Sequence, residues 1–364
     1  MSTTGRLALR VLVGALGLCA SMGTLLAGLP PGYTIIELGP ARGGNPEVRG
    51  INNKGQIIGF SSGGFVLQSW LWLPNPDYGL PAGMNVLARP GSDFVEVWDI
   101  NDAGQVVGRA SGGAFLWQNG SWVNLGVDKT AFGINNAGQV VGQFWSGSGG
   151  GTPGHAYLWP NTDLGTIGTL NNPTNAAAFA INDAGQIVGF GQGSGGAAHT
   201  QAFLWDAGEV TWLGVLGSAG ASQAWGINAS GMVAGGGDGG AFVWQQGLGM
   251  VGLGTLGGDY TMTHGGINDA GQVVGVSGIV PYLNPTCEHG FIWEDGVMHD
   301  LNDFIPPDSG WIVGETPKIN NNGWIAGTGF IDGRQSLILL VPVPEPATLS
   351  LLAVGGLVAL RRRR

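Results

Sequence analysis

The chain has 364 residues, among them 71 glycines, 14 tryptophans and 13 phenylalanines, so it combines a glycine content of about a fifth with many core-forming aromatic residues. This composition excludes a low-complexity linker, and the three lysines (Lys54, Lys129 and Lys318) are too few for a basic nucleic-acid-binding surface. Six of the 14 basic residues lie in the terminal segments, which leaves a body with a net charge of about −15 that favours neutral or cationic partners.

The N-terminal segment, residues 1–27, is predicted to be a secretory signal peptide. Arg6 and Arg10 precede an apolar stretch over residues 11–28, which is the charged-then-apolar layout of such signals. The lipoprotein alternative requires a small residue directly before Cys19, where a leucine stands instead. The sequence therefore predicts an exported protein.

A nine-residue pattern, Ile-Asn-x-x-Gly-x-h-h-Gly with h apolar or small, occurs seven times. The copies begin at Ile51, Ile100, Ile134, Ile181, Ile227, Ile267 and Ile319. Their spacing of 34 to 52 residues, about 45 on average, matches the length of a four-stranded propeller blade. In each copy the first glycine can adopt a positive φ and close a turn, so each copy is expected to form a hairpin.

Two further segments accompany each hairpin. An aromatic strand follows, ending at Trp72, Trp117, Trp159, Trp205, Trp244, Trp293 and Leu339. A fourth segment precedes each hairpin, at Tyr33, Trp122, Thr162, Val210 and Met250, with weaker versions around Val86 and Leu301.

Apolar residues at successive positions in these segments indicate sheets buried on both faces. Residues 33–341 are therefore predicted to form an all-β, seven-bladed β-propeller with four-stranded blades. The alternatives are an open stack of β-units or two smaller bodies. A closed ring requires the strand at Tyr33 to pair with the strand at 337–340.

The repeated elements resemble the HAF repeats of bacterial extracellular proteins. His155-Ala156-Tyr157 is the nearest copy of the His-Ala-Phe signature, and Gly113, Gln201 and Gly240 replace the histidine in other copies. The resemblance covers about 300 residues and implies export and a repeat structure, but no particular ligand.

The C-terminal segment, residues 343–364, combines a Pro-Glu-Pro motif, an apolar stretch at 347–360 and four arginines. A 14-residue helix spans about 21 Å, short of the roughly 30 Å hydrocarbon core, and the arginines would remain cytoplasmic with the body outside. The segment resembles the PEP-CTERM sorting tail of Gram-negative bacteria. The motif residues are Pro344, Glu345, Pro346, Arg361, Arg362, Arg363 and Arg364.

That resemblance implies a short transmembrane helix that holds the exported protein in the inner membrane until an exosortase-like enzyme processes it. The alternative is an ordinary C-terminal anchor. The expected partners are the export machinery and this enzyme, and the expected location is the secreted or cell-surface fraction of a Gram-negative bacterium.

Motifs for catalysis and cofactor binding lack their structural context. Residues 59–63 match Gly-x-Ser-x-Gly, and 191–196 and 235–240 match Gly-x-Gly-x-x-Gly, but no helix is expected after any of them. Asp102, Asp183 and Asp269 recur at the turns, but alanine follows each of them where a second oxygen ligand would be needed. One carboxylate per turn supplies too few oxygens for a calcium loop. The sequence predicts no catalytic residue, cofactor or metal.

The connection between hairpin and aromatic strand varies in length. Only five residues separate Gly108 from Ala114, whereas 143–155, 190–201 and 276–289 are long and are expected to be neighbours in an uneven rim. Aromatic and polar side chains there suit sugar rings, and the candidates are Trp145, His155, His199, Tyr282, Glu288 and His289. The alternatives are packing of the histidines at strand entrances and simple variation in loop length.

Two classes of function follow. The first is a non-enzymatic binding or structural module of the cell surface or matrix, with extracellular polysaccharide as the expected ligand. The second is a propeller-type glycan hydrolase or lyase, which needs converging carboxylates. Its candidates are the acidic residues unique to one unit, namely Glu96, Glu209, Glu288 and Glu315.

Overall fold

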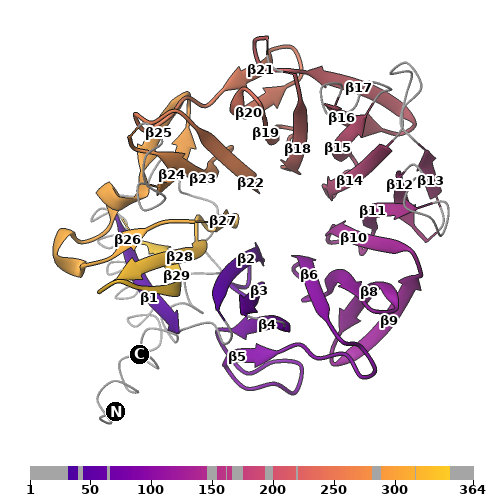
Figure 1. Ribbon diagram of the computed structural model, residues 1–364, viewed down its shortest axis with the longest axis horizontal. Coiled ribbons are helices and arrows are strands. Elements are labelled where there is room, and N and C mark those ends of the chain that lie inside the picture. The colour runs from indigo at the N-terminus through magenta and orange to yellow at the C-terminus, as the bar shows by residue number, and fades with distance from the viewer. Residues whose placement is uncertain are drawn as a thin grey trace, which may run out of the picture.

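The computed structural model describes residues 32–39, 44–63, 66–145, 154–160, 162–165, 175–192, 200–218, 220–280, 288–315 and 317–344. These residues form seven antiparallel sheets arranged radially around a central axis (Figure 1). The predicted seven-bladed β-propeller is confirmed. Six sheets have four strands in sequential order, and the seventh has five.

Each of the first six blades is a meander that runs from the axis outward. Blades 1 to 3 consist of β2(Asn45–Ile51), β3(Ile57–Gly63), β4(Val66–Leu73) and β5(Gly83–Val86); β6(Val95–Ile100), β7(Val106–Ala110), β8(Gly113–Gln118) and β9(Ser121–Gly126); β10(Lys129–Ile134), β11(Val140–Trp145), β12(Gly154–Trp159) and β13(Thr162–Gly165). Blades 4 to 6 consist of β14(Asn175–Ile181), β15(Ile187–Gln192), β16(Thr200–Asp206) and β17(Glu209–Gly214); β18(Ser222–Ile227), β19(Val233–Gly237), β20(Gly240–Gln245) and β21(Gly249–Gly252); β22(Thr261–Ile267), β23(Val273–Gly278), β24(Glu288–Glu294) and β25(Val297–Asp300).

Blade 7 departs from the pattern at both of its edges. Its inner edge is interrupted into β26(Ile312–Val313) and β27(Lys318–Ile319), which both pair with β28(Ile325–Ile331). The weak strand expected around Leu301 is β25, the fourth strand of blade 6, and the 3-10 helices η2(Leu301–Phe304) and η3(Pro307–Ser309) follow it before blade 7. The next strand, β29(Arg334–Pro342), pairs with β28.

The ring is closed by the first strand of the chain. Strand β1(Tyr33–Gly39) pairs antiparallel with β29, with Tyr33 opposite Pro342 and Ile36 opposite Leu339. This confirms the pairing predicted from the repeat count. Because the two ends of the ring share one sheet, opening the ring would cost every backbone hydrogen bond of that pair.

The repeated pattern forms the turn that the sequence predicts, at the end of each innermost strand. In blade 4 the Gly185 N–H donates to the Asn182 carbonyl at 3.0 Å, and the Asn182 N–H donates to the Gln186 carbonyl at 3.0 Å. Gly185 has φ 84°, a left-handed conformation that a residue with a Cβ adopts only at a cost. The seven turns define one face of the ring, which we call the turn face.

The asparagine of each pattern also joins its blade to the next blade. Its Nδ2 donates to the main-chain oxygen of the equivalent asparagine, at 2.9 to 3.3 Å, all the way round the ring. The order is Asn52, Asn101, Asn135, Asn182, Asn228, Asn268, Asn320 and back to Asn52. These seven side chains, which we call the asparagine ring, are buried, so the ring is held by polar as well as apolar contacts.

The apolar core lies between adjacent blades. Between blades 1 and 2, for example, Ile58 and Leu71 form a cluster with Val97 and Phe115. The central phenylalanines of the aromatic strands (Phe115, Phe203, Phe242 and Phe291) are among the largest fully buried side chains. Radial stacking therefore buries both faces of a sheet, as the apolar runs predicted.

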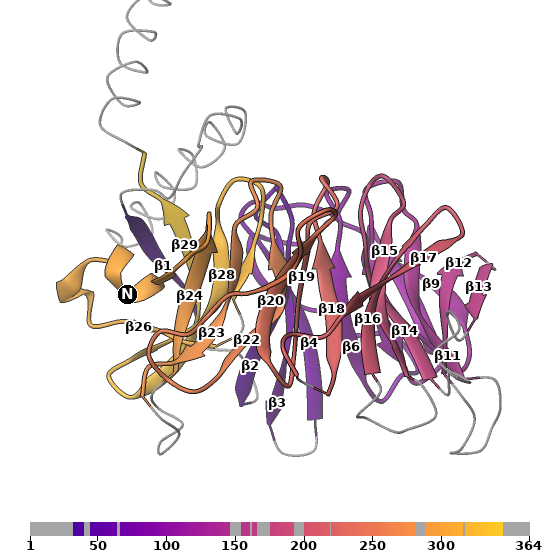
Figure 2. The ribbon, with the colours of Figure 1, turned by 90° about the horizontal axis from the view of Figure 1, so that it is seen from above.

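The connections between the second and third strand of each blade, and those from blade to blade, define the opposite face, which we call the loop face (Figure 2). Strand β29 ends, and β1 begins, at the turn face. Across the described ranges, no helix is long and apolar enough to cross a membrane. The predicted signal peptide (1–27) and the apolar stretch at 347–360 lie outside the described residues.

Candidate functional site: the loop face and the central axis

The structure describes only some of the candidate ligand residues. His199 and Tyr282 lie outside the described residues, and for Trp145 only the backbone is described, where it ends β11 opposite Gly154. His155 is the second residue of β12 and pairs with Phe144. The other two candidates, Glu288 and His289, begin β24.

The three long connections are not all neighbours, contrary to expectation. Blades 3 and 4 adjoin, but blade 5 separates them from blade 6, and the β19–β20 connection of blade 5 is only two residues long. The rim of the loop face is therefore uneven, with low stretches between the long connections. The sequence gives the length of each connection, but it does not show which short connections lie next to each other on the loop face.

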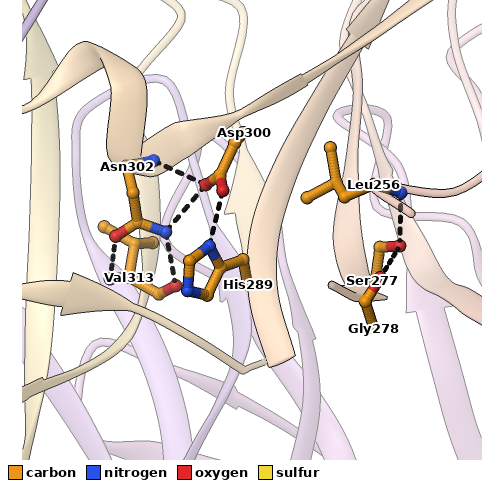
Figure 3. A network of polar contacts seen from close by, with 7 residues as sticks. All are labelled: Leu256, Ser277, Gly278, His289, Asp300, Asn302 and Val313. Atoms are coloured by element: carbon orange, nitrogen blue, oxygen red, sulfur yellow. Dashed lines mark hydrogen bonds and ion pairs between the residues drawn. The ribbon is translucent and has the colours of Figure 1, made fainter. Parts of the chain in front are cut away.

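The two histidines occupy equivalent positions and have equivalent partners. His155 Nδ1 lies 3.3 Å from a carboxylate oxygen of Asp163 on the outermost strand β13. His289 Nδ1 lies 2.5 Å from the Asp300 carboxylate at the end of β25 (Figure 3). In both blades the aspartate is paired with the aromatic residue two positions after the histidine.

Asp300 connects this pair to blade 7. Its other oxygen accepts hydrogen bonds from the main-chain N–H and the side-chain amide of Asn302, each at 2.8 Å. The Asn302 side chain in turn accepts from the Val313 N–H at 2.7 Å (Figure 3). Burial raises the pKa of Asp300, but the hydrogen bonds from His289 and Asn302 outweigh it and the pKa is lowered. The arrangement agrees with the alternative reading of His289 as a packing residue at a strand entrance.

A belt of large side chains surrounds the axis, and the sequence analysis did not identify it. The position two residues before the repeat isoleucine holds Arg49, Trp98, Phe132, Phe179 and Trp225. In blade 6 that position is Gly265, and the preceding His264 continues the belt, with its ring centroid 6.2 Å from that of Trp225. Ring centroids lie 4.9 Å apart for Trp98 and Phe132, 5.3 Å for Phe132 and Phe179, and 4.2 Å for Phe179 and Trp225. The Arg49 guanidinium lies 4.1 Å from the Trp98 ring centroid, which continues the belt into blade 1.

Two charged residues stand beside this belt, each directly before the isoleucine of its repeat. Other blades have glycine or alanine there, but blade 2 has Asp99 and blade 7 has Lys318. The Asp99 carboxylate accepts from the Ile100 N–H at 2.8 Å and, across the blade boundary, from the Ile134 N–H at 2.9 Å. Lys318 Nζ donates to the His264 carbonyl. Alignment of the seven copies alone would have revealed these two exceptions.

Burial shifts the pKa values of this axial group strongly. It raises the pKa of Asp99 to about 6, against the lowering effect of the two backbone hydrogen bonds and of Lys318. Burial and the nearby Arg49 lower the pKa of Lys318 to about 8. Burial, Lys318 and Arg49 lower the pKa of His264 to about 4, so this histidine is neutral at pH 7. The axis therefore holds the cations Arg49 and Lys318 and the carboxylate of Asp99, and Arg49 also pairs with Glu47 at 3.2 Å.

At the turn face, a depression of about 220 Å³ lies on the axis and is lined by the residues of all seven turns. The carboxylates of Asp102, Asp183 and Asp269 already accept hydrogen bonds from neighbouring turns; Asp183, for instance, accepts from the Asn136 N–H at 2.8 Å and from its side-chain amide at 3.0 Å. No cluster of metal-ligating side chains occurs in the part of the chain that the structure describes. These groups join the blades.

The four acidic residues unique to one unit do not converge at one place. Glu209 is exposed at the start of β17 on the outer edge of blade 4, and Glu96 lies 3.6 Å from Arg109. Glu288 and Glu315 are close enough to interact: burial, Glu288 and Glu47 raise the pKa of Glu315.

Comparison with known proteins supports the C-terminal prediction. Residues 342–364 match the PEP-CTERM protein-sorting motif. The match indicates an exported, surface-associated protein that an exosortase sorts. The resemblance to HAF repeats stays a prediction. No curated protein matches the chain.

Several solved propellers are similar in structure. The β-propeller domain of the trilobed protease from Pyrococcus furiosus is 12% identical, with a TM-score of 0.44 over 73% of this chain and 82% of that one. A gluconolactonase from Xanthomonas campestris is 11% identical, with a TM-score of 0.40 over 88% and 93%. A sialidase from Trypanosoma rangeli is also 11% identical, with a TM-score of 0.39 over 90% and 62%. Likeness at this level says nothing about activity.

Proposed function

We propose that this protein is a non-enzymatic binding module, exported and held at the cell surface, whose loop face binds extracellular polysaccharide. The HAF-like repeats and the expected signal peptide fit the same role. The tail is proposed to anchor the protein in the inner membrane until an exosortase-like enzyme processes it.

The observation that supports this most is the position of the chain ends. Strand β29 ends at Pro342 on the turn face, and the Val343 N–H donates to the Gly32 carbonyl at 2.9 Å, so both ends leave the ring together there (Figure 2). The matched motif begins at Pro342 and its apolar stretch only a few residues later. A four-residue spacer reaches at most about 14 Å. The turn face is therefore held toward the membrane, and the loop face is directed away from it.

Labelling of single cysteines tests this orientation. Ser111 lies on the loop face and Lys54 on the turn face, and both are exposed. In spheroplasts carrying the tail-intact protein with Cys287 replaced by serine, a bulky impermeant maleimide should modify Ser111→Cys much faster than Lys54→Cys. Equal rates before tail removal would contradict the orientation. Equal rates after tail removal are expected.

A glycan-binding screen of the full chain tests the ligand. Retention on the producer's own extracellular polysaccharide should fall for the combined Trp145→Ala and Tyr282→Ala variant, because aromatic faces pack on sugar rings. Lys54→Ala, on the opposite face, is the matched control. Retention that is unchanged in the double variant would reject the long connections as the binding surface.

A glycan hydrolase or lyase is the second candidate, and one observation favours it. Burial, Glu288 and Glu47 raise the pKa of Glu315, and a raised carboxyl pKa is a feature of the general acid in glycosidases. Release of new reducing ends from polysaccharide by the wild-type chain, and its loss in Glu315→Gln, would establish this candidate. We expect no release.

A further inference from the structure

The loop face is lowest between blades 2 and 3. Two residues, Ser111 and Gly112, connect β7 to β8, and two residues, Val127 and Asp128, connect β9 to β10. Every other connection from one blade to the next is at least five residues long. A depression of about 430 Å³ results, within the size range of small-ligand sites.

A close approach of two strands forms the floor of this depression. Gly113 begins β8 with φ 99°, and a Cβ there would lie 2.2 Å from the Gly126 carbonyl oxygen. Any larger residue would force the end of β9 away from β8. The hollow is thus part of the rigid blade rather than of a long loop.

The lining combines two cations with an aromatic ring. The Arg109 guanidinium lies 5.4 Å from the ring centroid of Phe94, and Lys129 Nζ lies 5.0 Å from that of Tyr157 in blade 3. Arg109 approaches Glu96 only to 3.6 Å, which is longer than a hydrogen bond, and its side chain is 42% exposed. Lys129 makes no ion pair with any described residue.

Cations are rare in the body of this protein, and the lining holds two of them beside one carboxylate. Only eight basic residues lie between the two terminal segments, and two of them, Arg109 and Lys129, line this hollow. Asp128 at the rim is the one acidic residue that lines the hollow within the described residues. An anionic group would be drawn to this place although the body as a whole repels it.

We propose that this depression binds a carboxylated sugar, a uronate unit of an acidic polysaccharide. Its carboxylate would accept hydrogen bonds from Arg109 and Lys129, and the apolar face of its ring would lie on Phe94. The proposal rests on the proposed function and names the class of polysaccharide that the loop face selects. It also explains why an acidic protein keeps cations at the lowest part of its rim.

The test is calorimetric titration of the full chain, in mild detergent, with trigalacturonate and with the neutral galactose trimer. Wild type should prefer the acidic trimer by about tenfold or more, and added salt should reduce that preference. Lys129→Gln and Arg109→Gln should each weaken binding of the acidic trimer by about five- to tenfold. Lys54→Gln, which removes the same charge on the turn face, should change it less than twofold.

Lys129→Arg keeps the charge and should keep the binding, which separates a lost contact from a misfolded variant. Equal affinity for the two trimers, unchanged binding by Lys129→Gln, or an equal loss in Lys54→Gln would each overturn the uronate site while leaving a polysaccharide module intact. Absence of binding to every glycan in the screen above would overturn the proposed function, and the uronate site with it.

Discussion

Replacement of one member of the asparagine ring tests what holds the propeller together. In Asn182→Ala, four hydrogen bonds disappear: Nδ2 donates to Asn228 O at 3.0 Å and to Gln186 Oε1 at 2.8 Å, and Oδ1 accepts from the N–H groups of Ala184 and Gln186. Each is worth about 1 kcal/mol net. Because axial water replaces some of them, we expect a loss of about 3 kcal/mol in the free energy of unfolding. With an m-value of about 3 kcal/mol/M, the urea midpoint would fall by about 1 M.

Urea unfolding followed by tryptophan fluorescence and by circular dichroism measures this loss, and agreement of the two probes checks that the ring unfolds as one unit. Asp183→Ala is the matched control. Its carboxylate also accepts two hydrogen bonds, both from Asn136, but the side chain is exposed and water can replace it, so the loss should stay below about 1 kcal/mol. If the two variants are equally destabilised, the buried ring is not a major source of stability.

Three further predictions address closure, titration and the histidine pair. Thr34 and Val341 face each other across β1 and β29, so cysteines at these two positions should form a disulfide that raises the melting temperature. Reductant should reverse the increase. Failure to form the disulfide would indicate that the ring is open in solution. Asp99 has a folded pKa of about 6 against 3.8 in an unfolded chain, so the folded state binds the extra proton and wild type loses stability as pH rises from about 4 to about 6. Asp99→Asn lacks this titration. The difference in urea midpoint between this variant and wild type should therefore increase from about pH 4 to about pH 6 and stay constant at higher pH. His289→Ala should lower the melting temperature and leave glycan affinity unchanged, because the side chain is bound to Asp300; the reverse pattern would make it a ligand residue.

The fold could be predicted because its cause is repeated seven times. The turn pattern fixes the blade count, and the apolar runs require sheets that are buried on both faces. Even the closing partner of the Tyr33 strand follows, because seven hairpins leave one unpaired strand at each end of the repeat array. The second role of Asn182 and its equivalents could not be predicted, because a bond to the next blade depends on the radius of the closed ring.

The candidate site was harder to predict for the opposite reason. Sequence analysis compared the lengths of connections and so pointed to the long ones, whereas the hollow at Arg109 and Lys129 exists because two short connections happen to adjoin. Those residues are separated by a whole strand pair, and nothing in the spacing of the repeats indicates that they share a cavity. Asp99 and Lys318 were accessible to sequence comparison, since each replaces a small residue, but their burial was not.

Each face of the ring is under a different constraint. On the turn face the asparagine ring uses the same residue in every blade, so a substitution there disturbs two blades at once. Among the described residues of the loop face no such bond recurs from blade to blade, and the connections there differ in length and composition. Both chain ends leave from the turn face, so the constrained face is also the one nearest the membrane in the orientation that we propose. If the loop face binds the ligand as proposed, substitutions there, such as at Lys129, can change ligand specificity without loosening the asparagine ring.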